Sequence, residues 1–157
     1  MKIYNKDISL FITLTRKYCR EVKILNNRPR AFAAIIENDC ILMVQVVKGE
    51  KSYWTLPGGG LENEETFEQA VIREVQEEVN LKVKVIKHLY TNSYEQGLEK
   101  CFLVQVVEQN STPILGFDPE LLIEQQELKE IKWQPIKEMV ADIQVSRVIR
   151  ALGLEFN

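Results

Sequence analysis

The sequence predicts one α+β domain in which a mixed β-sheet packs against one or two helices. Apolar segments of strand length outnumber helical ones, and the two kinds do not alternate strictly along the chain. With 157 residues, of which 45% are hydrophobic, the chain is long enough for one proper core. We therefore treat residues 1–157 as a single domain, and we find no repeat or linker-like stretch that would divide it.

Strand-like segments dominate the first third of the chain. Asn38 and Asp39 separate two apolar runs, which is a good signal for a β-hairpin. Pro57 and three glycines, Gly58 to Gly60, end the next short strand abruptly and predict a loop. The strands expected in this part span residues 8–15, 21–25, 31–37, 41–47 and 52–56.

A helix is expected to begin near residue 66, because Thr66-x-x-Gln69 is a capping-box pattern. Apolar residues at helical spacing would pack its inner face on the sheet; they are Val71, Ile72, Val75 and Val79.

Further strands follow this helix. Residues 110–130, with two prolines and a glycine, predict a long loop. The remaining expected elements are strands at residues 82–90, 100–107 and 131–133 and a helix within residues 136–152.

Three glutamates on the first helix are the strongest indication of function. Glu74, Glu77 and Glu78 share an arc of roughly 100° on one helix face. Their mutual repulsion and the unfavourable helix dipole destabilise the helix, and we expect Arg73 to point away from the arc. Such a cluster indicates a bound cation, and an oxygen-only ligand set favours Mg²⁺ or Mn²⁺ over zinc.

The glycines before the helix support this interpretation. Without side chains, Gly58, Gly59 and Gly60 allow a ligand to approach the backbone closely. A strand, a glycine loop and an acidic helix in succession are typical of a phosphate and metal site.

The segment from Gly59 to Leu81, with Glu65, Arg73, Glu74, Glu77 and Glu78 at fixed spacing, resembles the Nudix box of the MutT/Nudix hydrolases. Two positions depart from the family pattern. Asn80 replaces a glycine that follows the helix, where asparagine tolerates the usual left-handed conformation best among non-glycine residues. Glu64 stands where many members have glycine, which leaves the conformation of this loop open.

The resemblance implies a Nudix-type α/β/α sandwich with a central mixed β-sheet, and Mg²⁺-dependent hydrolysis of a diphosphate linkage in a nucleoside diphosphate derivative. By the same resemblance, the Gly58 carbonyl joins Glu74, Glu77 and Glu78 as a metal ligand, while Arg73 pairs with Glu65 to orient the helix and the loop. Gly59, Gly60 and Glu62 are expected to contact substrate. The general base remains open between Glu74 and a glutamate of the later loop, Glu127 or Glu124.

Composition limits the other possibilities. A net charge of −3 and a pI near 5.4 give no overall attraction to nucleic acid or to an anionic membrane. The expected partner, a small nucleotide-type substrate, is what the resemblance implies. No apolar run approaches a membrane span, and no signal-peptide pattern opens the chain. Three widely separated cysteines fit a reducing cytoplasm, and Cys40 and Cys101 are expected in the core. Homodimerisation is left open.

Two classes of function remain: a hydrolase, or a catalytically weak Nudix-fold module that binds or senses nucleotides. All three helix carboxylates are present, which favours the enzyme.

His88, the only histidine, is interpreted as structural. Five aromatic residues could include a base-stacking wall, although each is more often a core residue; they are Trp54, Tyr90, Tyr94, Phe117 and Trp133.

Overall fold

The computed structural model describes residues 27–117 and 121–156, so the strands expected at residues 8–15 and 21–25 lie outside the described residues. Seven strands form one sheet in the order β3-β2-β1-β6-β5, with β4 paired to β1 and β7 paired to β2. The strands are β1 (Arg30–Glu37), β2 (Cys40–Lys48), β3 (Lys51–Thr55), β4 (Gly58–Gly60), β5 (Val83–Tyr94), β6 (Gly97–Val106) and β7 (Leu128–Pro135).

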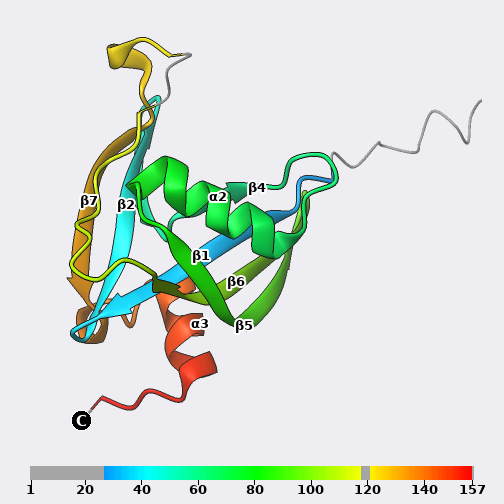
Figure 1. The fold of residues 1–157 in the computed structure, drawn as a ribbon. Helices are drawn as coiled ribbons and strands as arrows, with labels where there is room; N and C mark the ends of the chain where they lie inside the picture. The colour runs from blue at the N-terminus through cyan, green and yellow to red at the C-terminus, as the bar shows by residue number, and fades with distance from the viewer. Residues whose placement is uncertain (1–26, 118–120, 157) are drawn as a thin grey trace, which may run out of the picture.

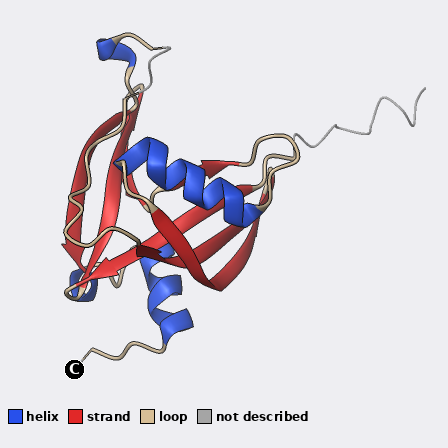
Figure 2. Ribbon diagram, in the orientation of Figure 1, coloured by secondary structure: helices blue, strands red, loops and turns tan. Residues whose placement is uncertain are grey.

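Two helices cover the sheet, α2 (Phe67–Val79) and α3 (Ile143–Leu152). Figure 1 shows α2 crossing in front of β1, β5 and β6, whereas α3 lies below the sheet near the C-terminus. The same view coloured by secondary structure shows the strands between the two helices (Figure 2). The α+β fold with a mixed central sheet is therefore confirmed, and each helix packs against its own hydrophobic cluster.

Strand β1 lies at the centre because both of its faces are buried. Ala31, Ala33 and Ile35 belong to the cluster under α2, whereas Phe32 and Ala34 belong to the cluster over α3. Alternate residues of a strand point to opposite faces, so one apolar run serves both clusters. Its neighbour β6 runs parallel to it, and its neighbours β2 and β4 run antiparallel, which makes the sheet mixed.

Several elements differ from the sequence-based expectation. Strand β5 runs to Tyr94 instead of residue 90, and β6 begins at Gly97 instead of residue 100. The glycines Gly58–Gly60 form a short strand, β4, because their backbone pairs with residues 30–32 of β1. Strand β7 begins at Leu128 because it pairs with β2 along almost its whole length. Within residues 136–152, a short 3₁₀ turn at Ile136–Glu138 precedes α3, whose N-cap is Asp142. No described helix is long and apolar enough to cross a membrane.

Helix α2 has the ends that the sequence predicts. Thr66 is the N-cap and forms the full capping box with Gln69, and Asn80 closes the helix in a left-handed conformation with φ 55° and ψ 37°. The buried side chains are Ala70, Val71, Val75 and Val79. Ile72 was expected among them, but it is 39% exposed because the packed face is shifted towards Ala70.

The left-handed backbone at Asn80 leads to a stability prediction. Asn80→Gly should change the free energy of unfolding little, because glycine adopts positive φ without strain and loses only the exposed bond that Gln76 donates to Asn80 Oδ1. Asn80→Val should destabilise the protein by about 1–2 kcal/mol, since a β-branched residue resists positive φ. Urea unfolding measures the stability of both variants. Asn80→Ala also removes the amide but is not β-branched, so it separates the effect of β-branching from that of losing the amide. Equal stability of the Gly and Val variants would contradict this account.

Candidate active site

The guanidinium of Arg73 ties helix α2 to the loop before it. Its Nε and Nη2 donate to Glu65 Oε1 and Oε2 at 2.9 and 2.8 Å, a bidentate pair. Glu65 Oε2 also accepts from the backbone N–H of Glu62 at 2.9 Å. The Arg73 guanidinium holds the pKa of Glu65 below its ordinary value, and Glu65 in turn is the largest cause that raises the pKa of Arg73. The pair expected from the resemblance is thus present.

Arg73 also reaches the acidic face, contrary to the expectation that it would point away. Its Nη1 donates to Glu74 Oε1 at 2.9 Å and to Glu77 Oε2 at 3.1 Å, while Nη2 donates to the Gly60 carbonyl at 2.9 Å. The long side chain and the five donors of arginine make this reach possible. One cation therefore offsets part of the repulsion within the glutamate cluster.

The loop between β4 and α2 has a left-handed residue at Glu64, with φ 63°. This explains why a glycine suits the position, because a β-carbon disfavours positive φ. Glu62 lies at the edge of this loop, with 71% of its side chain exposed and Oε1 3.9 Å from Arg73 Nε. At that distance it contributes little to the arginine network.

Glu74 packs directly on the glycine strand. A β-carbon built on Gly59 would lie 2.5 to 2.7 Å from both carboxylate oxygens of Glu74, so only glycine leaves room for that carboxylate. Burial is the largest cause that raises the pKa of Glu74 above its ordinary value, and the bond from Arg73 acts in the opposite direction. Sequence analysis expected Gly59 near the site but did not predict that it makes room for the Glu74 carboxylate.

Glu78 lies one helical turn further along and is held by the backbone of β4. The N–H of Gly58 donates to Glu78 Oε2 at 2.8 Å. Burial raises the pKa of Glu78 to about 8, and the nearby carboxylate of Glu74 adds to the increase, whereas Gly58 N–H and Arg30 oppose it. An ionised Glu78 is therefore disfavoured at neutral pH without an added positive charge.

The carboxylate oxygens of the acidic helix are the kind of ligand that a hard divalent cation prefers. Among residues 27–117 and 121–156, no three acidic, histidine or cysteine side chains are grouped closely enough to hold a metal ion. However, Glu74 and Glu78 are carboxylates whose pKa values are raised by burial, and a cation beside them would favour their ionised form. Glu77 is 57% exposed and bound to Arg73, so it has to leave that bond to join them. The three glutamates therefore fit a divalent cation if Glu77 releases Arg73.

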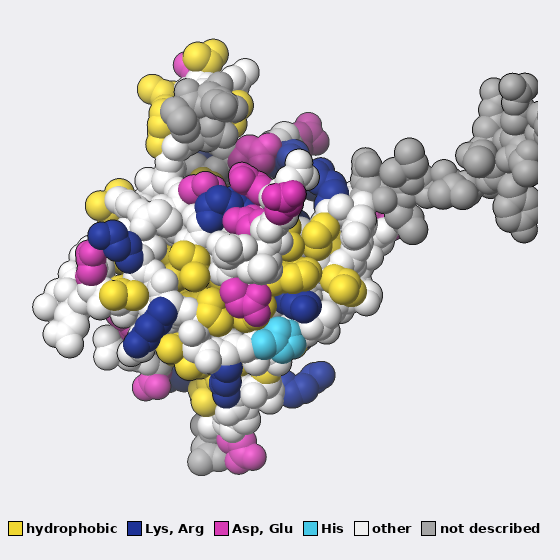
Figure 3. Space-filling model, turned by 45° about the vertical axis from the view of Figure 1, so that its right-hand side comes forward, with side chains coloured by type: hydrophobic (Ala, Val, Ile, Leu, Met, Phe, Trp, Pro, Cys, Tyr) yellow, Lys and Arg dark blue, Asp and Glu magenta, His cyan; other side chains and the backbone are white. Residues whose placement is uncertain are grey.

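A cleft of about 1180 Å³ opens beside the acidic residues. Glu77 and Glu78 of α2, Gly58 and Gly60 of β4, and the exposed Glu62 line one part of it. The rest of its lining comes from β1, β2, β3, β5, β6, β7, α3 and the segment near Gly116. Figure 3 shows acidic and basic side chains gathered together on one part of the surface. The cleft thus joins the acidic helix to segments that are distant in sequence.

The cleft also contains one of the glutamates considered as a general base. Glu127 lines it and forms an ion pair with Lys48, with Nζ and Oε1 3.2 Å apart. Its backbone carbonyl accepts from Val47 N–H at 2.8 Å, which places it at the start of the β2–β7 pairing. Glu124 lies in the 3₁₀ turn Ile123–Gln125 and is not part of the cleft lining.

Three of the five aromatic candidates line the cleft; they are Trp54, Tyr94 and Phe117. Trp54 also packs against the cluster over α3. Tyr90 and Trp133 do not line the cleft and pack against the two hydrophobic clusters. His88 is exposed, bonds to Thr91 Oγ1 at 2.9 Å and lies edge-on to Phe102, in keeping with a structural role. Cys101 is buried as expected, while Cys40 is only partly buried.

Sequence analysis missed the contribution of α3 to the cleft. Gln144 Oε1 accepts from the N–H of Leu56 at 3.0 Å, and Arg147 Nη1 donates to Glu99 Oε1 at 3.0 Å. Both α3 residues line the cleft. The partners are many residues apart in the chain, and the only local signal was polar residues on one flank of an amphipathic helix.

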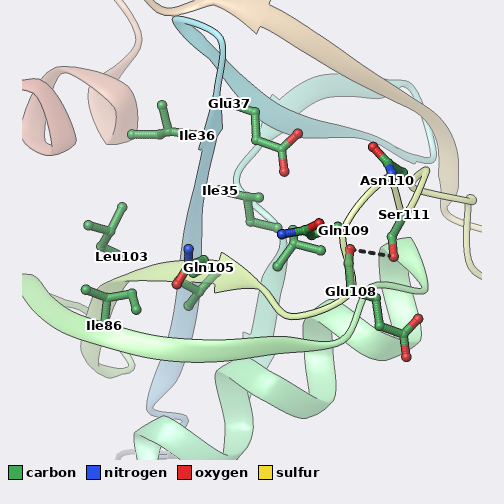
Figure 4. Close-up of a pocket in the computed structure, with 12 residues that line it drawn as sticks. Ile35, Ile36, Glu37, Ile86, Leu103, Gln105, Glu108, Gln109, Asn110 and Ser111 are labelled. Atoms are coloured by element: carbon green, nitrogen blue, oxygen red, sulfur yellow. Dashed lines mark hydrogen bonds between the residues drawn. The ribbon is translucent and has the colours of Figure 1, made fainter.

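A second cavity, of about 660 Å³, lies where β1 and β6 end. Its lining combines apolar side chains such as Ile86 and Leu103 with Glu37, Glu108 and Ser111 (Figure 4). No residue of the acidic helix lines it. The larger cleft is therefore the candidate active site.

Comparison with known proteins shows which family this sequence resembles. A family model for the NUDIX domain matches residues 27–152. The NAD-capped RNA hydrolase NudC of Salmonella agona is 32% identical over 119 residues, which are 74% of this chain and 42% of that protein. The chain thus spans less than half the length of the curated relatives it matches.

Solved structures share the fold at lower identity. An ADP-ribose pyrophosphatase from Streptococcus suis has a TM-score of 0.59 and 18% identity, with 81% of this chain and 90% of that chain covered. A NUDIX hydrolase from Nitrosomonas europaea has a TM-score of 0.61 and 22% identity, with 83% and 97% covered. At these identities the likeness establishes the fold.

The bidentate Arg73–Glu65 pair leads to a prediction on stability. Arg73→Lys should lower the free energy of unfolding by about 1–2 kcal/mol, because a lysine cannot serve both oxygens of Glu65 and the Gly60 carbonyl together. Urea unfolding measures the change. Lys82→Ala, which removes an exposed ion pair with Glu108, is the control and should leave the urea midpoint unchanged. An Arg73→Lys variant as stable as the parent would contradict the proposed role of the pair.

The raised pKa of Glu78 predicts a pH dependence of stability in the absence of divalent ions. The folded-state pKa of about 8 lies above the ordinary value of 4.5, so ionisation favours the unfolded state and stability falls as pH rises from about 4.5 to 8. Glu78→Gln removes this titration and keeps an oxygen for Gly58 N–H. In EDTA the variant should gain about 1–3 kcal/mol relative to the parent between pH 5 and pH 9. Parallel pH profiles for the two proteins would show that Glu78 does not titrate in this way.

Proposed function

This chain belongs to the NUDIX family, and we propose that it is a divalent-cation-dependent hydrolase that cleaves a diphosphate linkage in a nucleotide-type substrate. The observation that carries the proposal is the arrangement around Arg73. This residue binds Glu65, Glu74 and Glu77 together and holds them against the glycine strand, beside a cleft that Glu77 and Glu78 line. Such a concentration of carboxylates at a large cleft is typical of phosphate chemistry with metal ions.

The proposed metal ligands are Glu74, Glu77 and Glu78, with the Gly58 carbonyl as a further oxygen donor. The hard oxygen set favours Mg²⁺, and Mn²⁺ is expected to substitute. When bound, such an ion neutralises diphosphate oxygens, stabilises charge in the transition state and lowers the pKa of a coordinated water. NUDIX proteins generally use divalent metals, which supports this assignment.

The other residues of the site position these carboxylates. Arg73 and Glu65 set the angle between the loop and α2, and Gly59 leaves room for Glu74. Gly58 N–H holds Glu78 towards β4. Since a displacement of about 1 Å can reduce a rate by 10²-fold, these contacts serve catalysis by holding the carboxylates in place. Gly59, Gly60 and Glu62 remain proposed substrate contacts.

The proposed substrate class is supported by the cleft and by the names of related proteins. A NAD-capped RNA hydrolase is among the relatives, and ADP-ribose pyrophosphatase and UDP-X diphosphatase are among the structural neighbours. Each of those names refers to a nucleoside diphosphate joined to another group. Arg28, Arg30 and Lys48 line the cleft and would offset the negative charge of such a molecule.

We assign the general base to Glu127, with Glu74 as the alternative. Glu127 lines the cleft, whereas Glu74 is engaged by Arg73 and packed on Gly59. A base in this position would take a proton from the water molecule that attacks phosphorus, and no covalent intermediate with the enzyme would form.

A catalytically weak module that only binds or senses nucleotides is the second candidate. The engagement of Glu74 and Glu77 by Arg73 favours it, because both carboxylates are already neutralised in part. The two candidates differ in turnover, so the same experiments separate them.

Divalent ions should be required for turnover and should raise the Tm. We expect hydrolysis of one or more members of a panel of ADP-ribose, nucleotide sugars, NAD and nucleoside triphosphates in Mg²⁺ or Mn²⁺, and none in excess EDTA. Glu77→Gln should lower kcat by at least about 10²-fold, since it removes one proposed metal charge. Glu68→Gln, on an exposed face of the same helix, is the matched control and should be unaffected.

Two results would reject the hydrolase. Metal-stabilised binding without turnover of any panel member would select the binding module instead. In ¹⁸O-water, label is expected in a phosphate-containing product, and label found only on carbon would show that another kind of bond is cut.

The assignment of the base is tested by pH profiles. Glu127→Gln should lower kcat by about 10²–10⁴-fold and flatten the acidic limb of the profile, because general-base catalysis contributes on that scale. Glu124→Gln, in the same region but outside the cleft lining, should retain the parental profile. If Glu74→Gln flattens this limb and Glu127→Gln spares it, the base lies on α2.

A further inference from the structure

The last turn of α2 is covered by a segment from far along the chain, residues 114–117. A helix ends with backbone carbonyls that have no partner within the helix. Here Gly116 N–H donates to the carbonyl of Glu78 at 2.7 Å, and Ile114 N–H donates to that of Val79 at 2.9 Å. The segment therefore docks on the turn that carries two proposed metal ligands.

Residue 116 has to be glycine because the helix leaves no space for a β-carbon there. A β-carbon on it would lie 1.9 Å from the Glu77 carbonyl oxygen and 3.0 Å from Glu78 Cα. Both atoms belong to the helix backbone, which cannot yield as a flexible side chain can. Any larger residue would thus push the segment away from the helix.

This contact determines where Phe117 lies. Phe117 follows Gly116 directly, and both line the cleft together with Glu77 and Glu78. The Phe117 side chain is 60% exposed, so it gains little from burial in the fold. Ile114, in the same segment, is equally exposed at 60% but is not part of the cleft lining.

We propose that Phe117 is a substrate-binding residue that stacks on the aromatic base of the substrate, and that Gly116 is the positioning residue that places it beside the acidic turn of α2. The proposal rests on the proposed function, and it names the part of the substrate that the cleft recognises. An exposed ring offers any nucleobase an apolar face. Docking by Gly116 keeps this face at a constant offset from Glu77 and Glu78.

A binding experiment tests this without turnover. The probes are the monophosphates of 2-aminopurine riboside and of pyrrolocytidine, a fluorescent purine and a fluorescent pyrimidine, added to the 157-residue protein in EDTA. Stacking on the ring should quench at least one of them. Phe117→Ala should weaken binding of that probe by about 5- to 150-fold, the effect of losing one base–aromatic stack. Ile114→Ala is the matched control and should bind as the parent does.

Kinetics provide the second test. Phe117→Ala should raise KM for the substrate that the panel identifies, with kcat changed less than KM, and Phe117→Trp should restore KM. Gly116→Ala should weaken binding of the probe as Phe117→Ala does, because the added β-carbon pushes the segment that carries Phe117 away from the helix. If Gly116→Ala does not fold, the Phe117 variants still decide the question.

Different results would overturn the two proposals. Absence of quenching by the parent protein, or equal binding by Phe117→Ala and Ile114→Ala, would overturn the role of Phe117 even if hydrolysis is observed. Quenching that Phe117→Ala abolishes, in a protein that hydrolyses nothing, would support base stacking and reject the hydrolase.

Discussion

The guanidinium of Arg73 is the contact on which the geometry of the site depends. It joins Glu65 in the loop, the Gly60 carbonyl at the end of β4 and two carboxylates of α2, with donor–acceptor distances of 2.8 to 3.1 Å. A planar fork with five donors can satisfy acceptors in several directions at once, which an ammonium group cannot do with the same rigidity. The loop, the strand and the helix therefore take one relative position.

The same site concentrates negative charge in a partly buried place. Burial raises the pKa values of Glu74 and Glu78, while Glu65, bound on both oxygens by Arg73, has a lowered pKa. Three carboxyl groups on neighbouring elements thus differ in their preference for ionisation because their surroundings differ. Arg73 thus favours the ionised form of Glu65, the positioning carboxylate, whereas burial raises the pKa values of Glu74 and Glu78, which are proposed to meet a cation.

The architecture of the sheet provides the cleft in which this chemistry can act. Strand β1 is packed on both faces, and it pairs with β2 only beside the hairpin that joins them. The rest of β2 pairs with β3 and β7 instead. Side chains from both parts of the sheet, from α3 and from the segment at Gly116 line the space between them. The lining of the cleft is therefore distributed over the whole domain, whereas Glu62, Glu77 and Glu78 come from one short segment.

The sequence by itself determined the acidic helix and its ends, since capping and periodicity depend on residues three to four positions apart. Thr66, Gln69 and Asn80 act as predicted, and so does the pairing of Arg73 with Glu65. Only the tertiary structure decided that Gly58–Gly60 form a strand, that Arg73 also binds Glu74 and Glu77, and that Gly116, Gln144 and Arg147 border the cleft. These contacts join residues such as Leu56 and Gln144, which are 88 positions apart. No local pattern encodes such a pair, because its geometry depends on how the sheet twists and how both helices pack on it.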